Sequence, residues 1–345
     1  MILAGDIGGT KTVLALFDLA GGELRRLRDA TFSSRRYESF DAILEEFLRD
    51  ALAPRLAGAC FGVAGRVERG SVRATNLPWS LDEQALARVL ATPRVTLIND
   101  LQAAAYGMLF LDPAELAILQ SGTARPDEED DEGNIAVIAP GTGLGEAILY
   151  WDGERYHPIA SEGGHSDFAP RTDLEIELLK YLRAALGGHV SYERVLAGDG
   201  IWNLYSFLRD TGGQPEPEWL RRRLEADDRN AAITQLGLSG DHPLCVGALD
   251  LFCTILGAEA ANLALKCLAA GVIIGGGIAP KIVPALRTSK FTDAFADKGR
   301  FSRWLGEIPV KVALNTQAPL IGAARSLVGP APVGGRREQR GKEDE

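Results

Sequence analysis

Three glycine-rich turns carry the strongest chemical signal in the sequence. Each follows a short apolar segment, and they comprise residues 6–11, 140–145 and 275–277. Backbone N–H groups can bind phosphate where glycine lets the ligand approach and lets φ become positive. The Walker pattern G-x-x-x-x-G-K-[ST] is absent, which excludes a P-loop enzyme. From the residues alone, phosphate binding and ordinary hairpin turns remain equal alternatives.

Two acids, Asp6 and Asp100, lie at the ends of apolar segments that are predicted strands. The carboxyl ends of strands are where α/β sheets place ligand-binding groups. Phosphoryl transfer needs a carboxylate to orient and deprotonate the attacking hydroxyl, and an acid to hold hydrated Mg²⁺ near the phosphates. The alternatives are a turn residue for Asp6 and the N-cap of the following helix for Asp100.

The segment 161–167 places two acids and a histidine, among them Glu162 and His165, around paired glycines. Carboxylates and a histidine can read the vicinal hydroxyls of a polyol, and the glycines let the backbone bring them together. A polar surface loop is the alternative. Glu193 lies early in a predicted helix, where an acid that interacts with the helix dipole is the simpler interpretation.

The elements that must position these residues alternate between β-rich and helical patterns, which predicts a sheet covered by helices. The predicted strands are 2–5, 13–17, 59–64, 95–98, 135–139, 146–150 and 271–274. The predicted helices are 40–52, 81–90, 101–109, 174–186, 201–208, 249–268 (apolar nearly all round, hence buried) and 319–328. Ser80 with Glu83 predicts a capping box for the second helix, and Asp173 is the predicted cap of the fourth. The order strand, glycine turn, strand occurs twice, which indicates a duplicated unit.

Composition excludes several classes of protein. The net charge of −10 argues against a broad nucleic-acid-binding surface. The four cysteines form no C-x-x-C pair, so neither a disulfide framework nor a zinc site is indicated. No signal peptide is visible, and the uncharged stretch 266–281 is too short and glycine-rich to span a bilayer. We therefore expect a cytoplasmic protein without membrane or nucleic-acid partners, with a solvated acidic loop at 127–132.

Taken together and in order, segments along nearly the whole chain resemble the bacterial glucokinase family of the sugar-kinase, heat-shock ATPase and actin superfamily. The first glycine motif is shared by many sugar kinases, whereas Glu-Gly-Gly-His followed by Glu-Arg-Val-Leu is far more specific. The matching segments are 5–12, 75–76, 98–100, 141–145, 162–168, 193–196, 275–278 and 297–301.

The resemblance implies a role for each candidate residue. Asp100 is implied as the catalytic base for the 6-hydroxyl of glucose, and Asp6 as the carboxylate that holds Mg²⁺ through water. The implied substrate-binding residues are Asn99, Asp100, Glu162, His165 and Glu193. The implied ATP-binding residues are Gly8, Gly9, Thr10, Lys11, Gly141, Thr142, Gly143, Gly275, Gly276 and Gly277.

The resemblance also implies an α/β architecture, the two-domain, ribonuclease-H-like duplicated fold of actin-like ATPases with an interdomain cleft. The small domain would comprise 1–111 plus 318–330 and the large domain 112–317, followed by a disordered tail over 331–345. The implied activity transfers the γ-phosphate of ATP to glucose, giving glucose 6-phosphate and ADP in glycolysis, with a homodimer as the expected assembly.

Three rival functions share parts of this pattern. A ROK-type kinase for another hexose or an N-acetylhexosamine would usually carry a cysteine-rich zinc motif after the active-site histidine, yet no cysteine occurs between Cys60 and Cys245. A sugar-sensing regulator would need a DNA-binding helical module, whereas this sequence opens on the first predicted strand. An actin-like filament protein would lack the Glu-Gly-Gly-His segment.

Overall fold

The computed structural model describes residues 1–345 except 21–22, 50–54, 76, 124–132 and 329–345. The predicted acidic loop at 127–132 and the predicted tail at 331–345 therefore lie outside the described residues. The chain divides into two compact units. Unit 1 contains Met1–Phe110, Glu154–His157 and the segment that begins at Gln317, and unit 2 contains Leu111–Gly153 and Pro158–Thr316.

The sheet of unit 1 has the strand order β3-β2-β1-β4-β8. An antiparallel hairpin joins β1 to β2, and β1, β4 and β8 run parallel. Because β4 is buried at every position, it is apolar throughout instead of alternating. The strands are β1 Ile2–Ile7, β2 Lys11–Ala20, β3 Glu23–Ser33, β4 Gly58–Val63 and β8 Val95–Asn99.

A small second sheet in unit 1 corrects one prediction. It consists of β5 Val67–Glu68, β6 Ser71–Arg73 and β7 Ser80–Asp82. The predicted helix start at Ser80 is wrong, because these residues pair with β6 and bury Leu81. Helix α2, Glu83–Val89, begins later, and its N-cap is Asp82, which accepts a 2.9 Å hydrogen bond from the Ala85 N–H.

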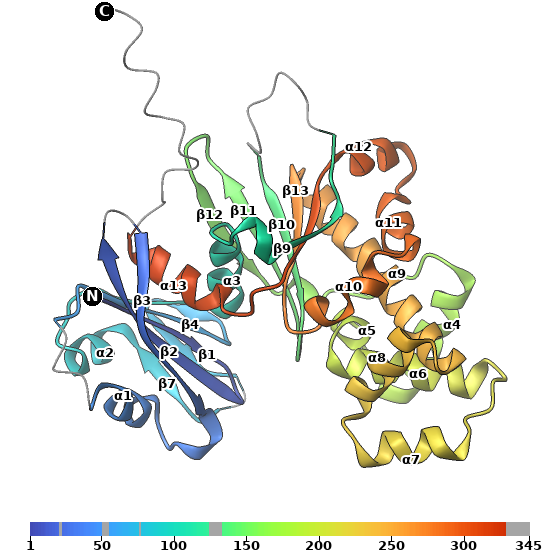
Figure 1. Ribbon diagram of the computed structural model, residues 1–345, viewed down its shortest axis with the longest axis horizontal. Coiled ribbons are helices and arrows are strands. Elements are labelled where there is room, and N and C mark those ends of the chain that lie inside the picture. The colour runs from blue at the N-terminus through green and yellow to red at the C-terminus, as the bar shows by residue number, and fades with distance from the viewer. Residues whose placement is uncertain (21–22, 50–54, 76, 124–132, 329–345) are drawn as a thin grey trace, which may run out of the picture. The chain divides into compact units, whose positions relative to one another are not determined.

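Three longer helices complete unit 1: α1 Phe40–Leu48, α3 Asp100–Met108 and α13 Ala318–Val328. Helices α3 and α13 pack side by side although they lie at opposite ends of the sequence (Figure 1). Two glycines permit this approach: a Cβ on Gly107 would lie 1.8 Å from the Ala318 carbonyl oxygen, and one on Gly322 would lie 1.8 Å from that of Ala103. The C-terminal helix therefore belongs to the core of the N-terminal unit.

The sheet of unit 2 repeats this topology. Its order is β12-β11-β10-β13-β14-β9, with an antiparallel β10–β11 hairpin and with β10, β13 and β14 parallel. The predicted duplication is thus confirmed: a glycine turn joins β1 to β2 in unit 1 and β10 to β11 in unit 2, and a parallel strand, β4 or β13, pairs with the other edge of β1 or β10. The strands are β9 Leu116–Gln120, β10 Ile135–Pro140, β11 Leu144–Trp151, β12 Tyr156–Ser161, β13 Gly271–Ile274 and β14 Val310–Ala313.

The core of unit 2 forms around the long helix α9, Pro243–Cys267, which packs against α6, α8 and α11 (Figure 1). The predicted buried helix at 249–268 is confirmed. By length and composition, α9 is the one helix among the described residues that could cross a membrane, and most of its apolar stretch is buried inside the unit. The other α-helices of unit 2 are α4 Asp173–Leu186, α5 Glu193–Leu196, α6 Gly198–Thr211, α7 Glu218–Ala226, α8 Arg229–Ser239, α10 Val283–Leu286, α11 Ser289–Ala296 and α12 Ser302–Glu307.

The predicted cap of α4 needs a small correction. The N-cap is Thr172, whose side chain accepts a 3.2 Å hydrogen bond from the Glu175 N–H, and Asp173 is the first helical residue. Both types cap helices well, so the sequence pattern cannot separate neighbouring candidates. Gly187 ends the helix in the left-handed conformation at φ 72°, as predicted from the paired glycines.

Candidate active site

The first glycine turn is closed by its own backbone and held by a serine from outside the motif. The Gly8 N–H donates to the Lys11 carbonyl oxygen over 3.0 Å. Ser34 makes two further hydrogen bonds to the turn. Its hydroxyl donates to the Gly8 carbonyl oxygen over 2.7 Å, and its N–H donates to the Thr10 carbonyl oxygen over 3.0 Å. Ser34 belongs to no motif, and only the β2–β3 register brings it here. The turn is therefore fixed without using up the N–H groups of Gly9 and Thr10 in these contacts.

Asp6 is the penultimate residue of β1 and interacts with Asp100 at the start of α3. Burial, and then the negative charge of Asp100, raise the pKa of Asp6 to about 6, against the lowering influence of Lys11. Gly62 on the intervening β4 makes room for the helix, because a Cβ there would lie 3.0 Å from the Ala103 Cβ and 3.5 Å from the Asp100 Cα. Two carboxylates predicted from separate motifs thus belong to one electrostatic site.

Asn99 is the N-cap of α3, so the alternative interpretation of Asp100 as the cap is wrong. The Asn99 Oδ1 accepts hydrogen bonds from the Leu101 and Gln102 N–H groups at 3.0 and 3.2 Å. The Asn99 Nδ2 donates to the Gly65 carbonyl oxygen over 3.2 Å. Asp100 is the first helical residue, and its Oδ1 also accepts from the Leu101 N–H over 2.9 Å. The two side chains are therefore held by the helix start.

Replacing Asp6 with Asn should stabilise the protein and lower its activity. The folded pKa of about 6 exceeds the ordinary 3.8, so the native state holds the extra proton between these values. Stability therefore falls as pH rises from about 4 to about 6, and the variant escapes this loss, gaining about 1–3 kcal/mol near pH 8. Turnover should fall at least about tenfold if the carboxylate serves phosphoryl transfer. Thermal unfolding at about pH 4 and pH 8 measures the first effect, and an equal gain at both pH values would contradict this explanation.

The two glycine turns of unit 2 contact each other. The Gly141 N–H donates to the Gly143 carbonyl oxygen over 2.8 Å, which closes the turn between β10 and β11. Gly276 has φ 77°, and a Cβ there would lie 2.2 Å from the Pro140 carbonyl oxygen. A third glycine was missed by sequence reasoning: the Gly198 N–H, at the start of α6, donates to the Gly141 carbonyl oxygen over 2.9 Å. The turns 141–143 and 275–277, which are both predicted to bind ATP, are therefore adjacent in the structure.

Two predicted sugar ligands of unit 2, Glu193 and His165, lie near Leu144, directly after the glycine turn 141–143. The Leu144 N–H donates to the Glu193 Oε2 over 3.1 Å, and the other Glu193 oxygen lies 4.0 Å from the His165 Nδ1. Gly164 must be glycine, because a Cβ there would lie 2.1 Å from the Leu144 carbonyl oxygen. Glu162 precedes the 3₁₀ turn Gly163–His165 and is exposed. Glu193 lies in the first turn of α5, as the alternative interpretation states, and it also accepts a specific hydrogen bond at this cluster.

Two backbone contacts hold the histidine and glutamate segments together. The Phe168 N–H donates to the Val190 carbonyl oxygen over 2.9 Å, and the Tyr192 N–H donates to the Ser166 carbonyl oxygen over 3.0 Å. His165 and Glu193 adjoin this pairing, so their separation is set by main-chain hydrogen bonds.

The predicted residues fall into two groups, one in each unit. Unit 1 contains Asp6, Gly8, Gly9, Thr10, Lys11, Asn99 and Asp100; unit 2 contains Gly141, Thr142, Gly143, Glu162, His165, Glu193, Gly275, Gly276 and Gly277. Within each unit the structure brings together residues that come from distant motifs. The roles assigned to them stay predictions.

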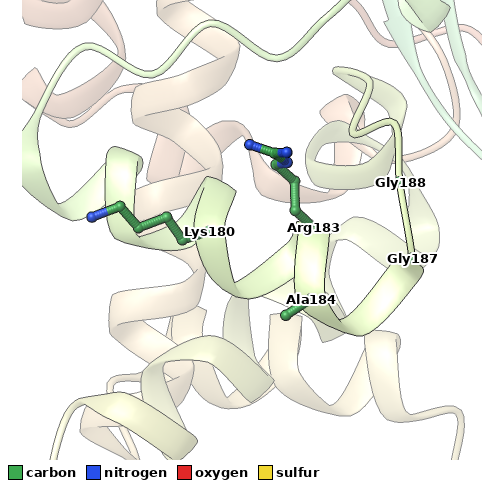
Figure 2. Close-up of a pocket in the computed structure, with 5 residues that line it drawn as sticks. All are labelled: Lys180, Arg183, Ala184, Gly187 and Gly188. Carbon is green, nitrogen blue, oxygen red and sulfur yellow. The ribbon is translucent and has the colours of Figure 1, made fainter.

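An open, shallow hollow elsewhere in unit 2 does not carry this chemistry. It has a volume of about 430 Å³ at the end of α4 and is lined by Lys180, Arg183, Ala184, Gly187 and Gly188. Figure 2 shows the Lys180 and Arg183 side chains pointing in different directions. It contains none of the predicted site residues, and its two cations do not converge on one ligand position.

Comparison with known proteins identifies the family of the chain. A model of the glucokinase family matches residues 3–329. The glucokinase of Nostoc sp. (strain PCC 7120) is 43% identical over 342 residues, which cover 94% of this chain and 98% of that protein. The crystal structure of a glucokinase from an Antarctic psychrotroph is 34% identical with a TM-score of 0.80, and the match covers 95% of this chain and 98% of that one.

A ROK family glucokinase from Streptomyces griseus, solved in complex with glucose and AMPPNP, is 21% identical with a TM-score of 0.64. That match covers 94% of this chain and 98% of the other and shows the fold alone. The predicted sugar-kinase fold of actin-like ATPases is confirmed by these structures. ROK proteins share this fold, so the fold alone does not separate the glucokinase family from the ROK family. The match of the glucokinase family model over residues 3–329 makes that distinction. The chain therefore belongs to the glucokinase family, and its activity is that of a glucose kinase.

Proposed function

We propose that the chain transfers the γ-phosphate of ATP to the 6-hydroxyl of glucose, with Asp100 as the general base. The observation that carries the proposal is the arrangement around Leu144. This residue follows the phosphate turn Gly141–Gly143 directly, and its N–H donates to Glu193, which lies beside His165. One short segment thus joins a phosphate-binding backbone to side chains suited to sugar hydroxyls.

The sugar is read by fixed acceptors and donors. Glu193 and His165 are held by main-chain contacts, and exposed Glu162 extends the same cluster. Asn99 and Asp100 in unit 1 supply the remaining polar groups, with Asp100 taking the proton of the attacking hydroxyl. A hydroxyl that is missing or inverted leaves such a group unpaired, which is how polar sites discriminate between sugars.

ATP is bound by the glycine turns. Gly8, Gly9, Thr10 and Lys11 form one phosphate turn, and Gly141, Thr142 and Gly143 form the other, while Gly275–Gly277 provide backbone against the adenosine side. The close approach of Gly276 to Pro140 supports the assignment of both glycine turns of unit 2 to the same nucleotide.

Mg²⁺ fits the acidic pair in unit 1. Burial, and then the negative charge of Asp100, raise the pKa of Asp6, and a divalent cation would offset both effects by stabilising the carboxylate. Across the described ranges, no three His, Cys, Asp or Glu side chains gather as a protein-only metal site. Asp6 would therefore hold Mg²⁺ through water, as this ion prefers, and the ion would neutralise charge on the transferred phosphate.

The proposal also covers the location, assembly and pathway of the protein: it is a cytoplasmic homodimer that acts in glycolysis. It is supported by the kinship to the curated glucokinases and by an acidic composition with net charge −10. Light scattering of the purified protein measures its assembly directly.

A sugar panel tests the function. Glucose should exceed mannose and galactose in kcat/KM by at least about tenfold with ATP as donor, because an inverted hydroxyl loses its partner. Glu162→Gln should erode this preference, whereas Glu225→Gln, an exposed acid on α7, should keep it. Glu162 suits the test better than Glu193, which also holds the Leu144 N–H. Equal use of the three sugars by the native enzyme would refute this interpretation, and ADP and polyphosphate in the same assay define the donor.

A further inference from the structure

Two buried carboxyl groups lie next to the two sugar-ligand segments of unit 2, which are the segment that carries Glu162 and His165 and the segment that carries Glu193. Glu146 on β11 is 1% exposed and Glu259 on α9 is 0% exposed, and their side chains hydrogen-bond to each other. A hydrogen bond between two carboxyl groups requires that one of them carry a proton. Neither residue belongs to the glycine motifs or to the predicted sugar ligands.

Glu146 supports the segment that carries Glu162 and His165. A Cβ on Gly163 would lie 2.1 Å from the Glu146 Oε2, so the bare backbone of this residue rests on the carboxyl group. Ser161 adds a second link, because its hydroxyl donates to the Glu146 carbonyl oxygen over 2.9 Å and accepts from the Gly163 N–H over 3.1 Å. A displacement of the Glu146 side chain would therefore be transmitted to the Gly163 backbone.

Glu259 connects to the segment that carries Glu193. Asn262, one turn further along α9, donates to the Glu259 Oε2 over 2.7 Å and lies 3.1 Å from the hydroxyl of Tyr192, the residue before Glu193. The Tyr192 hydroxyl also hydrogen-bonds with Glu259. Lys298, from a family-like segment without an assigned role, donates to the Asn262 Oδ1 over 2.6 Å. The carboxyl pair is thus connected to both sugar-ligand segments, through Gly163 and through Tyr192.

The cations around the pair lie on the side of Glu259. Lys266 is the cation beside it, with its Nζ 3.6 Å from the Glu259 Oε1. Lys298 donates to Asn262, and its charge interacts with Glu259, Asp297 and Glu175 and is opposed by Arg171. Lys298 is not among the charges that act on Glu146, whereas Lys266 is. Since a buried charge needs a partner, one acid of the pair must stay neutral. Burial, and then the charge of Glu259, accordingly raise the pKa of Glu146 to about 7, against the opposing charge of Lys266.

We propose that Glu146 and Glu259 share one proton, and that this pair is a positioning element for Glu162, His165 and Glu193. Loss of the proton leaves two adjacent buried carboxylates, which repel each other and shift the Gly163 backbone. Glucose affinity therefore falls as pH rises, with a smaller change in turnover. The inference rests on the proposed glucose site.

The test compares wild type with Glu146→Gln, whose amide stays neutral and can donate to Glu259. Wild-type KM for glucose should rise about fivefold or more between about pH 6 and pH 9, with a smaller change in kcat. In Glu146→Gln the rise should be less than about twofold over the same range. Every other ionisable group, those of ATP included, is common to both proteins, so its effect cancels in the comparison. Glu225→Gln is the matched control and should keep the wild-type profile.

Thermal unfolding provides a readout independent of activity. The folded pKa of Glu146 lies above the ordinary 4.5, so the wild type loses stability as pH rises through about 7. The advantage of Glu146→Gln in Tm should therefore be larger at about pH 9 than at about pH 5. If Glu146→Gln fails to fold, Glu259→Gln, which also removes the repulsion, takes its place in both measurements.

The outcomes separate this inference from the proposed function. A flat wild-type KM, or an equal rise in Glu146→Gln and Glu225→Gln, overturns the positioning role. A Tm advantage that does not depend on pH overturns the shared proton. If the wild type phosphorylates no sugar at any pH, the proposed function fails, while the unfolding data still decide whether the proton is shared.

Discussion

Replacing Asp100 with Asn should lower kcat about 10²–10⁴-fold, equivalent to about 3–5 kcal/mol of transition-state stabilisation. The amide keeps the shape of the side chain, and its Oδ1 can still accept the 2.9 Å hydrogen bond from the Leu101 N–H. It cannot take the proton of the attacking hydroxyl. Glucose affinity should change far less, because the predicted hydroxyl ligands Glu162, His165 and Glu193 are untouched. Steady-state kinetics with glucose and ATP measure both parameters.

Asp41→Asn is a matched control for this variant. Asp41 and Asp100 are both acids in the first turn of a helix in unit 1, so both lose the same favourable interaction with a helix N-terminus. If the effect at Asp100 arose from the helix, Asp41→Asn would destabilise its own helix by a similar amount. We expect near-native kcat in Asp41→Asn. Near-native kcat in Asp100→Asn would exclude Asp100 as the base.

The sequence predicted the framework well because local patterns encode it. Both hairpins with glycine turns, the buried helix α9 and the C-terminal helix follow from apolar runs and from glycine at fixed places. The first residues of the helices were predicted less accurately. Ser80 is a good capping residue, yet it lies in β7, because pairing with β6 is a tertiary contact that outweighs local preference.

The candidate site was predictable as a set of residues, whereas its supports were not. Ser34 reaches the Gly8 turn only through the register of β2 with β3, and Gly198 reaches Gly141 only through the placement of α6. Glu146 and Glu259 are ordinary charged residues in sequence, and only the packing of α9 on the sheet brings them together. Such contacts join distant segments and leave no local pattern.

Gly276→Ala should impair ATP binding more than any single glycine change that merely strains the backbone. The residue has φ 77°, which costs a non-glycine residue about 1–2 kcal/mol. In addition, the new methyl group would lie 2.2 Å from the Pro140 carbonyl oxygen, at the base of the Gly141–Gly143 turn. The backbone must move to relieve this contact, and both turns proposed to bind ATP would move with it. We expect the KM for ATP to rise about tenfold or more, with a smaller effect on glucose.

Gly187→Ala separates backbone strain from the contact with Pro140. Gly187 has nearly the same φ, 72°, but nothing lies within 4 Å of the position that its Cβ would occupy. It ends α4 and should lose about 1 kcal/mol of stability without a change in ATP kinetics. Gly306→Ala, with open space and no positive φ, serves as a neutral reference. Nucleotide titration and thermal unfolding of all three variants give the comparison. If Gly276→Ala binds ATP as well as Gly187→Ala does, the Gly275–Gly277 turn does not form part of the nucleotide site.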